Sequence, residues 1–394
     1  MPGRNPLSDR VAERRRRAFG VATRAMGGLL LLLAHPGAQA RTNVYSRDNY
    51  RDVRWVGRGN TGVASISDGS ALFYNPAGLA FSPAYSLTVL NPFLGADQSF
   101  VSSAREAKGI TSGGKKLTER FSPFLGKPLS VQGGIFPNLA IPNFAVGFWD
   151  YADAQISYRN PVNPEFDVQG RNDYGFITGG AARFRNFSAG GSIRFQRRKL
   201  VKEYLTGGSL LNVDGNTLKN LVRSGDGWGL NLGAQYMHEL GPSHRLSFGT
   251  TVEDVGNTKF RNQKGGRSPE PQRQQINAGA TYGFDSTFID GLVLFDMRQI
   301  RNTDMSYTKK IYMGTELSFL YMDFRGGFFQ GNWTAGLSLR FFPIFTLDFS
   351  TYGEELDYAA GIRRSRIYMI GLRSGLQMKK AAIKKSRLSL DDVP

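Results

Sequence analysis

Residues 57–80 read GRGNTGVASISDGSALFYNPAGLA, and this stretch decides how the rest of the chain is interpreted. It is dense in Gly, Ser, Asn and Asp, it follows a predicted export signal, and the sequence after it reads as a series of strands. A cluster of these residue types indicates tightly turned, irregular backbone. We therefore predict that this stretch is a plug and that the strands form the barrel that it closes.

A nucleotide-binding loop is the competing interpretation of the same stretch. Gly57, Gly59 and Gly62 match the spacing G-x-G-x-x-G of the dinucleotide fingerprint. That fingerprint requires a preceding strand, a following helix and a parallel sheet, and none of these is readable here. The glycines therefore favour a tightly folded segment over a nucleotide site.

The first 40 residues have the three parts of a secretory signal. Arginines crowd positions 14–17, an apolar run covers residues 26–34, and Ala38-Gln39-Ala40 resembles a cleavage site. The apolar run is too short to span the hydrocarbon of a membrane, and no later run of 18 apolar residues predicts a helical span. We predict a signal over 1–40, a mature chain from Arg41, and export to the cell outer membrane of a Gram-negative cell.

Composition favours a β protein. The chain has 394 residues, 48 of them glycine, and 12% aromatic residues, whereas average glycine usage is roughly 7%. The absence of cysteine excludes disulfides and thiolate sites. The formal net charge of +18 is spread along an exported chain, which argues against nucleic acid and suggests contact with membrane lipid and anionic lipopolysaccharide.

Alternation of apolar and polar residues marks the strands. In residues 228–236 the even positions are apolar or aromatic and the odd positions are Gly, Asn or Gln. The same split recurs in 187–196, 276–282 and 332–341. This period of two gives each strand one apolar and one polar face. In a membrane barrel the apolar face meets lipid and the polar face lines the lumen.

Counting such segments predicts about 14 strands and a transmembrane antiparallel β-barrel. They lie at roughly 84–92, 129–136, 143–159, 172–184, 187–198, 228–239, 244–256, 273–284, 289–299, 309–319, 322–329, 333–341, 344–352 and 363–373. Connections after even-numbered strands are short, whereas 94–128, 160–171, 199–227 and 257–272 are long. This sorting is typical of outer-membrane barrels with both termini on the periplasmic side. The predicted domains are a hatch over 41–83, a barrel over 84–373 and a basic periplasmic tail over 374–394.

Catalytic signatures are weak throughout. The chain has no G-x-S-x-G, and His238 and His244 flank a turn. The acidic residues Glu354, Glu355 and Asp357 are expected to meet solvent in a loop. We predict no enzyme activity, no metal and no cofactor. A membrane-bound hydrolase remains a weak alternative that would need a Ser-His pair at one rim.

Residues 59–80 carry a family resemblance. The segment 59–64, Asp68 and the run 71–79, which contains Asn75-Pro76-Ala77, resemble the N-terminal hatch of the FadL superfamily of outer-membrane barrels. This superfamily includes the FadL/TodX transporters of fatty acids and aromatic hydrocarbons and the PorV/TraF-like branch. Residues 252–258 are similar to a strand-end motif of that branch. The resemblance implies a barrel of 14 strands with the hatch inside its lumen, on the periplasmic side.

The resemblance and the alternation together give two sets of candidate residues. The predicted hatch or gating residues are Gly59, Asn60, Gly62, Asp68, Asn75, Pro76, Ala77 and Gly78. Their glycines suit close packing, and the Asn and Asp side chains can satisfy buried backbone amides. The predicted lumen residues for an anionic head group are Arg194, Gln235 and Arg340.

Two functions follow from this interpretation. The first is hatch-gated passive uptake of a small hydrophobic or amphipathic molecule, of the fatty-acid or aromatic-hydrocarbon type, which leaves laterally or through a gap that the hatch opens. The second is a sealed, PorV-like barrel that docks or shuttles a partner protein in secretion or envelope assembly. A continuous apolar cavity would distinguish the first from the second.

Overall fold

The computed structural model describes residues 48–82, 84–102, 122–159, 165–206, 221–262, 266–342, 344–355 and 364–379. The predicted signal, residues 41–47 and the chain beyond Lys379 lie outside this described part. No helix of the described part is long and apolar enough to cross a membrane.

Sixteen strand segments make up the sheet. They are β1 (Ala84–Leu90), β2 (Phe93–Asp97), β3 (Pro128–Ile135), β4 (Asn138–Ile141), β5 (Phe144–Arg159), β6 (Glu165–Phe184), β7 (Phe187–Thr206), β8 (Arg223–Glu239), β9 (His244–Glu253), β10 (Gln275–Asp285), β11 (Ile289–Met297), β12 (Ile311–Phe319), β13 (Met322–Phe329), β14 (Asn332–Phe342), β15 (Phe345–Glu355) and β16 (Arg364–Lys379).

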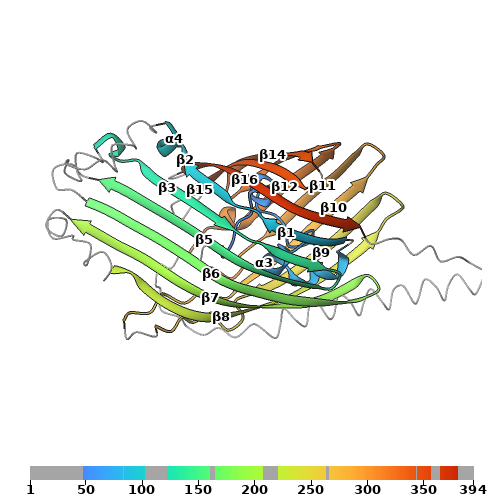
Figure 1. The fold of residues 1–394 in the computed structure, drawn as a ribbon, viewed down its shortest axis with the longest axis horizontal. Helices are drawn as coiled ribbons and strands as arrows, with labels where there is room; N and C mark the ends of the chain where they lie inside the picture. Colours follow the sequence, from blue (N-terminus) through green and yellow to red (C-terminus); the bar gives the residue numbers. More distant parts are fainter. Residues whose placement is uncertain are drawn as a thin grey trace, which may run out of the picture. The chain divides into compact units, whose positions relative to one another are not determined.

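The segments close into one antiparallel barrel (Figure 1). Both β1 and β2 pair with β16, and both β3 and β4 pair with β5. Each of these two couples is therefore one interrupted barrel strand, so the 16 segments form 16 − 2 = 14 barrel strands. The registers Leu87↔Leu376 and Phe93↔Gly371 close the ring. The predicted 14-strand antiparallel barrel is confirmed.

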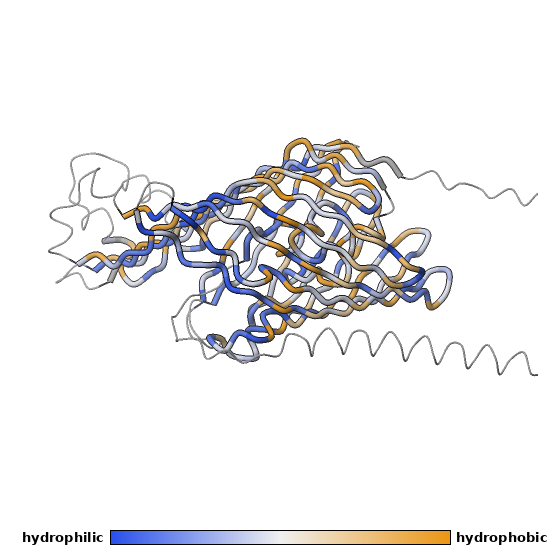
Figure 2. Tube along the Cα trace, turned by 90° about the horizontal axis from the view of Figure 1, so that it is seen from below, coloured by the Kyte–Doolittle hydropathy of each residue, from blue (hydrophilic) through white to orange (hydrophobic). Residues whose placement is uncertain are grey.

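The two faces of the strands differ as the alternation predicts. On β8, Trp228 is 64% exposed, whereas Asn231 and Gln235 are 2% and 3% exposed. On β7, Ile193 is 46% exposed and its neighbour Arg194 only 1%. Figure 2 shows hydrophilic and hydrophobic residues alternating along the strands. The barrel thus has an apolar outer wall and a polar lumen, as a membrane-spanning barrel requires.

The connections are sorted by length between the two ends. At the short-turn end they are only two to four residues long, such as 185–186 and 240–243. At the long-loop end lie the connections 98–127, 207–222 and 254–274. One exception is the two-residue turn Gln330-Gly331 between β13 and β14 at the long-loop end. The predicted sorting is otherwise confirmed.

Two predicted loops were partly wrong. Residues 165–171 and 199–206 belong to β6 and β7, which are 20 residues each and pair along their whole length from Phe184↔Phe187 to Glu165↔Thr206. Together with β5, whose last residue pairs with the first of β6, these strands extend far at the long-loop end (Figure 1). A sheet beyond the apolar band no longer needs an apolar outer face, so the alternation fades there while the pairing continues. β16 is also longer than predicted and ends at Lys379 rather than at residue 373.

Six short helical turns complete the described part. Three lie in residues 48–82, which we call the plug: α2 (Val53–Gly57), α3 (Ala71–Tyr74) and η1 (Pro76–Phe81). The other three are α4 (Gln98–Ser102), η2 (Ser122–Phe124) and η3 (Tyr307–Lys310). Almost every plug residue up to Leu79 is buried, and its apolar side chains form one core with inward-facing residues of the barrel. The main core of the protein is therefore the inside of the barrel.

Candidate functional site: the plug and the wall around it

The fold of the plug is set by local caps. Asp52 precedes α2 and accepts a hydrogen bond from the backbone N–H of Arg54 at 2.9 Å. Asn75 ends α3 and caps η1 by accepting from the N–H of Ala77 at 3.1 Å, and Pro76 takes the first position of η1. These are the residue types that begin helices. The Asn75-Pro76-Ala77 motif therefore encodes the change from one helical turn to the next.

Asn75 also ties the plug to the wall. Its side-chain N–H donates to the carbonyl of Val63 within the plug at 2.7 Å and to the carbonyl of Ala234 on β8 at 3.2 Å. The hydroxyl of Ser188 on β7 donates to the carbonyl of Ala77 at 3.0 Å. The plug is thus joined to the wall by groups that satisfy its irregular backbone, which a buried segment requires.

The predicted glycines of the plug lie where a side chain would not fit. Gly59 has φ +75°, and a Cβ added to it would overlap the carbonyl oxygen of Met313 on β12. The N–H groups of Gly62 and Val63 both donate to one carboxylate oxygen of Asp296 on β11, at 2.7 and 3.1 Å. A Cβ on Gly78 would overlap the carbonyl of Ile66. These glycines let the plug backbone approach the wall and itself closely.

The wall meets the plug with glycines of its own. A Cβ on Gly314 would overlap the carbonyl of Arg58, and one on Gly233 would overlap the side-chain oxygen of Asn75. The other wall glycines with a plug atom among their nearest neighbours are Gly179, Gly190, Gly249, Gly279, Gly327, Gly336 and Gly371. Sequence reasoning missed this set. The sequence did contain a signal for these glycines. In the alternating strands, glycine occupies inward-facing positions such as 233 and 279, where the neighbouring inward positions carry polar residues.

Buried ion pairs add charge to this contact. Arg51 pairs with Glu354 of β15 at 3.3 Å, and Arg58 pairs with Glu316 of β12 at 3.2 Å. Asp48 of the plug pairs with Arg298, which follows β11 of the wall, at 3.2 Å. Removing one partner of such a buried pair leaves an uncompensated charge, which costs roughly 3–5 kcal/mol. The pairs therefore resist displacement of the plug.

The predicted gating residues Asn60 and Asp68 lie at different levels of the plug. Asn60 is fully buried with φ +54°, donates to the carboxylate of Asp48 at 3.0 Å and accepts from the hydroxyl of Tyr74. Asp68 pairs with Arg54 at 3.0 Å and is partly exposed. All eight predicted gating residues lie in the plug, and their gating role stays a prediction.

The carboxylate of Asp48 makes the stability of the seated plug depend on pH. Burial raises the pKa of Asp48, but the guanidinium groups of Arg298, Arg51 and Arg171 outweigh burial and hold the pKa below its ordinary value. A lowered pKa contributes stability above the ordinary value of about 3.9, and that stability is lost as the pH falls through the lowered pKa. We expect the plug to stay seated at pH 5–7 and to loosen only below about pH 3.9, seen as conductance in planar lipid bilayers.

Two variants test this dependence. Asp48→Asn removes the carboxylate that Arg51 and Arg298 both contact and leaves Arg298 only Glu253, at 3.5 Å, so we expect it to conduct already at neutral pH. Asp285→Asn removes an exposed carboxylate, 47% exposed and paired with Arg245, and should leave the acid threshold unchanged. An Asp48→Asn barrel that opens at the same pH as the wild type would contradict this assignment.

The three predicted ligand residues are not brought together. Arg194 is buried and donates to Asp254 and Gln196, both at 2.6 Å. Gln235 donates to the carbonyl of Ala64 in the plug at 2.9 Å. Arg340 is 40% exposed at the short-turn end and pairs with Asp323. Two of the three therefore support the wall and the seated plug, and only Arg340 faces open space.

Residues 252–258 form a hub at the long-loop end of the lumen. Asp254, with φ +52°, accepts from Arg194 and from the hydroxyl of Thr258, both at 2.6 Å, and from Asn49 of the plug at 3.2 Å. Its neighbour Glu253 accepts from Asn277 at 2.6 Å. The motif thus fixes the beginning of the plug against β7 and β9.

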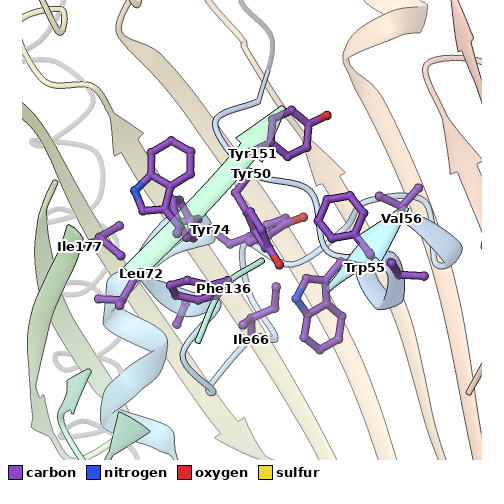
Figure 3. Packing of buried hydrophobic residues seen from close by; sticks show 14 of the residues in the cluster. Tyr50, Trp55, Val56, Ile66, Leu72, Tyr74, Phe136, Tyr151 and Ile177 are labelled. Atoms are coloured by element: carbon purple, nitrogen blue, oxygen red, sulfur yellow. The ribbon is translucent and has the colours of Figure 1, made fainter. Parts of the chain in front are cut away.

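Aromatic rings form the apolar part of the lumen (Figure 3). Tyr50 and Phe73 of the plug lie 5.2 Å apart between ring centroids. Phe73 lies 5.1 Å from Phe136 and 5.5 Å from Trp149 of the wall. Two further wall residues, Phe93 and Tyr151, pack against Tyr50. We call these six residues the aromatic cluster.

The wall beside the aromatic cluster is interrupted. Pairing of β1 with β4 ends at Thr88↔Asn138, and pairing of β2 with β3 begins at Phe93↔Gly134. We call the residues between them, 89–92 and 135–137, the seam, because these two segments do not pair with each other although each still bonds to the strand on its other side. Pro92 and Pro137 have no N–H to give to the sheet. The side chain of Asn91 closes part of the seam by accepting from the N–H of Phe136 at 2.6 Å.

Plug residues line a small cavity and a larger one within the described part of the chain. One, of about 10 Å³, lies beside the seam and is lined by Tyr50, Asn91, Pro92 and Phe93 among others, which leaves room for about one water molecule. The other, of about 700 Å³, lies at the short-turn end, where Arg54 and Asp68 of the plug meet Arg340 and Arg373 of the wall. A small ligand at the aromatic cluster would thus need the rings to move.

His244 lies at the short-turn end, where its ring nitrogen is 2.9 Å from the hydroxyl of Tyr282, and both side chains are exposed. Within the described residues no group of three or more His, Asp or Glu side chains could hold a metal ion.

The fold and the site define a transmembrane β-barrel whose lumen is filled by a buried N-terminal plug. The chain matches no family model and no curated protein. It is similar to the solved structures of the P. putida toluene transporter TodX (11% identity, 83% of this chain and 97% of that one, TM-score 0.46), the Ralstonia pickettii toluene transporter TbuX (13%, 82% and 97%, 0.43) and the CymD monoaromatic hydrocarbon channel (12%, 83% and 96%, 0.41).

Proposed function

We propose that this protein is an outer-membrane channel for passive uptake of small hydrophobic or amphipathic molecules, and that the plug is its hatch. The observation that carries the proposal is the aromatic cluster behind the seam. There an apolar part of the lumen lies next to a break in the ladder of hydrogen bonds between two neighbouring wall strands. The proposal rests on this geometry and not on the likeness to the toluene transporters.

The charged part of the lumen is a poor path for a hydrophobic molecule. Pairs such as Arg51–Glu354, Arg171–Asp153 and Arg194–Asp254 are almost fully buried. An apolar ligand among them would remove their partners and offer no hydrogen bonds in return, which is costly. The six rings of the aromatic cluster carry no such penalty, and aromatic faces pack well against hydrocarbon.

Movement of the plug is part of this proposal because the plug supplies two of the six rings. A ligand that displaces Tyr50 and Phe73 would lie against Phe136, which belongs to the seam together with Pro137. From there it could leave sideways into the membrane between the interrupted strands. In this proposal Arg194 and Gln235 stabilise the closed state instead of binding the ligand. Arg340 remains the proposed contact for an anionic head group.

A sealed docking barrel is the second candidate. The observation that favours it is the number of bonds that hold the plug, which include the ion pairs of Arg51, Arg58 and Asp48 with the wall. In this case the plug would never move, and the exposed short-turn end would receive a partner protein.

Tryptophan fluorescence can separate the two candidates. Trp228 and Trp333 face outward, 64% and 54% exposed, so Trp228→Phe/Trp333→Phe removes their signal without touching the lumen. We expect toluene or a short fatty acid to change the remaining emission in a saturable way, because Trp149 belongs to the aromatic cluster. Adding Trp149→Phe should leave only the smaller change that comes from Trp55 of the plug. No saturable change with any hydrophobic ligand, together with a co-purifying protein in native mass spectrometry, would favour the docking barrel.

A further inference from the structure

Two arginines stand side by side on the outer surface of the barrel. Arg364 and Arg366 are two residues apart on β16 and therefore lie on the same face. That face is the outer one, because Tyr368 and Ile370 continue it at 44% and 46% exposure, while Ile367 and Met369 between them are buried. Lipid-facing surfaces of barrels rarely carry charge within their apolar band. The pair therefore needs a physical explanation.

Arg366 is held in a fixed orientation. Its guanidinium carbon lies 3.7 Å from the ring centroid of Trp333 on β14, and its Nη1 donates to the carbonyl of Trp333 at 2.8 Å. Stacking on an indole ring keeps a guanidinium flat and leaves its other N–H groups free to bond outward. The site is thus organised before any ligand arrives.

Neither arginine has a carboxylate partner among the described residues. Arg364 lies opposite Glu355 in the register of β15, but Glu355 is fully buried, and its carbonyl accepts from Lys309 at 3.1 Å. Arg197, also on the outer face near the long-loop end, differs in this respect, since it makes two bonds to Asp226, at 2.5 and 2.8 Å. The Arg364/Arg366 pair carries two positive charges that these residues leave uncompensated.

The pair lies at the level of the lipid head groups. The outward positions of β16 from Tyr368 to Leu376 are apolar or aromatic except Ser374. A strand needs about 9–11 residues to cross the hydrocarbon. Arg366 therefore comes directly after the apolar band, at the long-loop end, and Trp333 beside it is typical of the aromatic belt at that level.

We infer that Arg364, Arg366 and Trp333 form a binding site for the phosphate-bearing head group of a membrane lipid. A phosphate carries up to two negative charges and accepts paired bonds from the fork of a guanidinium. The long-loop end is the predicted exterior, so the ligand fits the phosphates of lipopolysaccharide. The site is separate from the lumen and independent of the proposed uptake function.

Binding of lipid A to the full barrel in a neutral detergent tests this inference. Native mass spectrometry would compare diphosphorylated lipid A, dephosphorylated lipid A and phosphatidylglycerol, with inorganic phosphate as competitor. We expect Arg364→Gln/Arg366→Gln to weaken binding of diphosphorylated lipid A at least tenfold and Trp333→Leu to weaken it less. Arg197→Gln is the matched control and should bind as the wild type does.

The outcomes separate the possible ligands. Phosphatidylglycerol that binds as tightly as lipid A assigns the site to phosphate-bearing lipids in general, whereas weaker binding assigns it to lipopolysaccharide. Competition by inorganic phosphate shows that the head group carries the recognition. Unchanged binding by the double variant, or equal binding of dephosphorylated lipid A, overturns the inference. Circular dichroism of the variants would show that the barrel is intact.

Discussion

A disulfide between the plug and the wall is expected to lower uptake of a hydrophobic tracer at least tenfold. The substitutions are Gly69→Cys in the plug and Asn138→Cys on β4. A Cβ at position 69 would lie 3.3 Å from the Cβ of Asn138, close to the roughly 3.5–4.5 Å of disulfides. The nearest atoms that this Cβ meets all belong to the Asn138 side chain, which the second substitution removes. The chain has no other cysteine that could pair wrongly.

The reason for the expected loss is that transport through the aromatic cluster requires Phe73 to move, and Phe73 follows position 69 by four residues. Uptake should return when a reductant opens the disulfide. The single Asn138→Cys variant is an essential control, because Asn138 donates to the carbonyl of Phe136 at 2.8 Å and so supports the seam. A locked barrel that takes up tracer at the normal rate would show that the hatch need not move. A wild type without uptake would point to the docking barrel.

Much of this architecture could be predicted because it depends on local patterns. Alternation in residues 228–236 placed Asn231 and Gln235 inside the barrel, where both are almost fully buried. The glycine and asparagine content of residues 57–80 predicted irregular buried backbone. In each case a residue and its near neighbours in the sequence are enough for the prediction. The alternation has a period of two because one face of each strand meets lipid and the other meets the lumen.

The pairing of distant residues could not be predicted in the same way. Asp296 accepts a hydrogen bond from the N–H of Gly62, which is 234 positions away in the sequence. The residues around either one do not indicate that the two are partners. Arg194 was predicted to meet a ligand, and in the structure it forms an ion pair with Asp254, the residue that follows β9. An inward position tells which residues enter the lumen but not which of them meet, since that depends on how the strands are staggered around the barrel. The seam was missed for the same reason, because the register between β1/β2 and β3/β4 brings Pro92 and Pro137 to the same break in the pairing.

Gly59→Ala is expected to unseat the plug and open the barrel to ions. The new Cβ would overlap the carbonyl oxygen of Met313 and lie 2.8 Å from that of Phe328, and both belong to paired wall strands that cannot yield easily. Alanine at φ +75° adds strain of roughly 1–3 kcal/mol. The shift would also weaken the bond from the N–H of Gly59 to Thr334, now 3.0 Å. In planar lipid bilayers we expect an open probability at least ten times that of the wild type.

Gly126→Ala separates the two causes of this effect. Gly126 has nearly the same conformation, φ +74°, but a Cβ added there meets no atom within 4 Å. It shares the backbone strain without the overlap, so its conductance should match the wild type while its thermal stability falls slightly. If Gly59→Ala stayed as closed as Gly126→Ala, close contact with the wall would not be what seats the plug. If both conducted, strain alone would suffice, and the wall glycines would have to be explained by packing of the strands themselves.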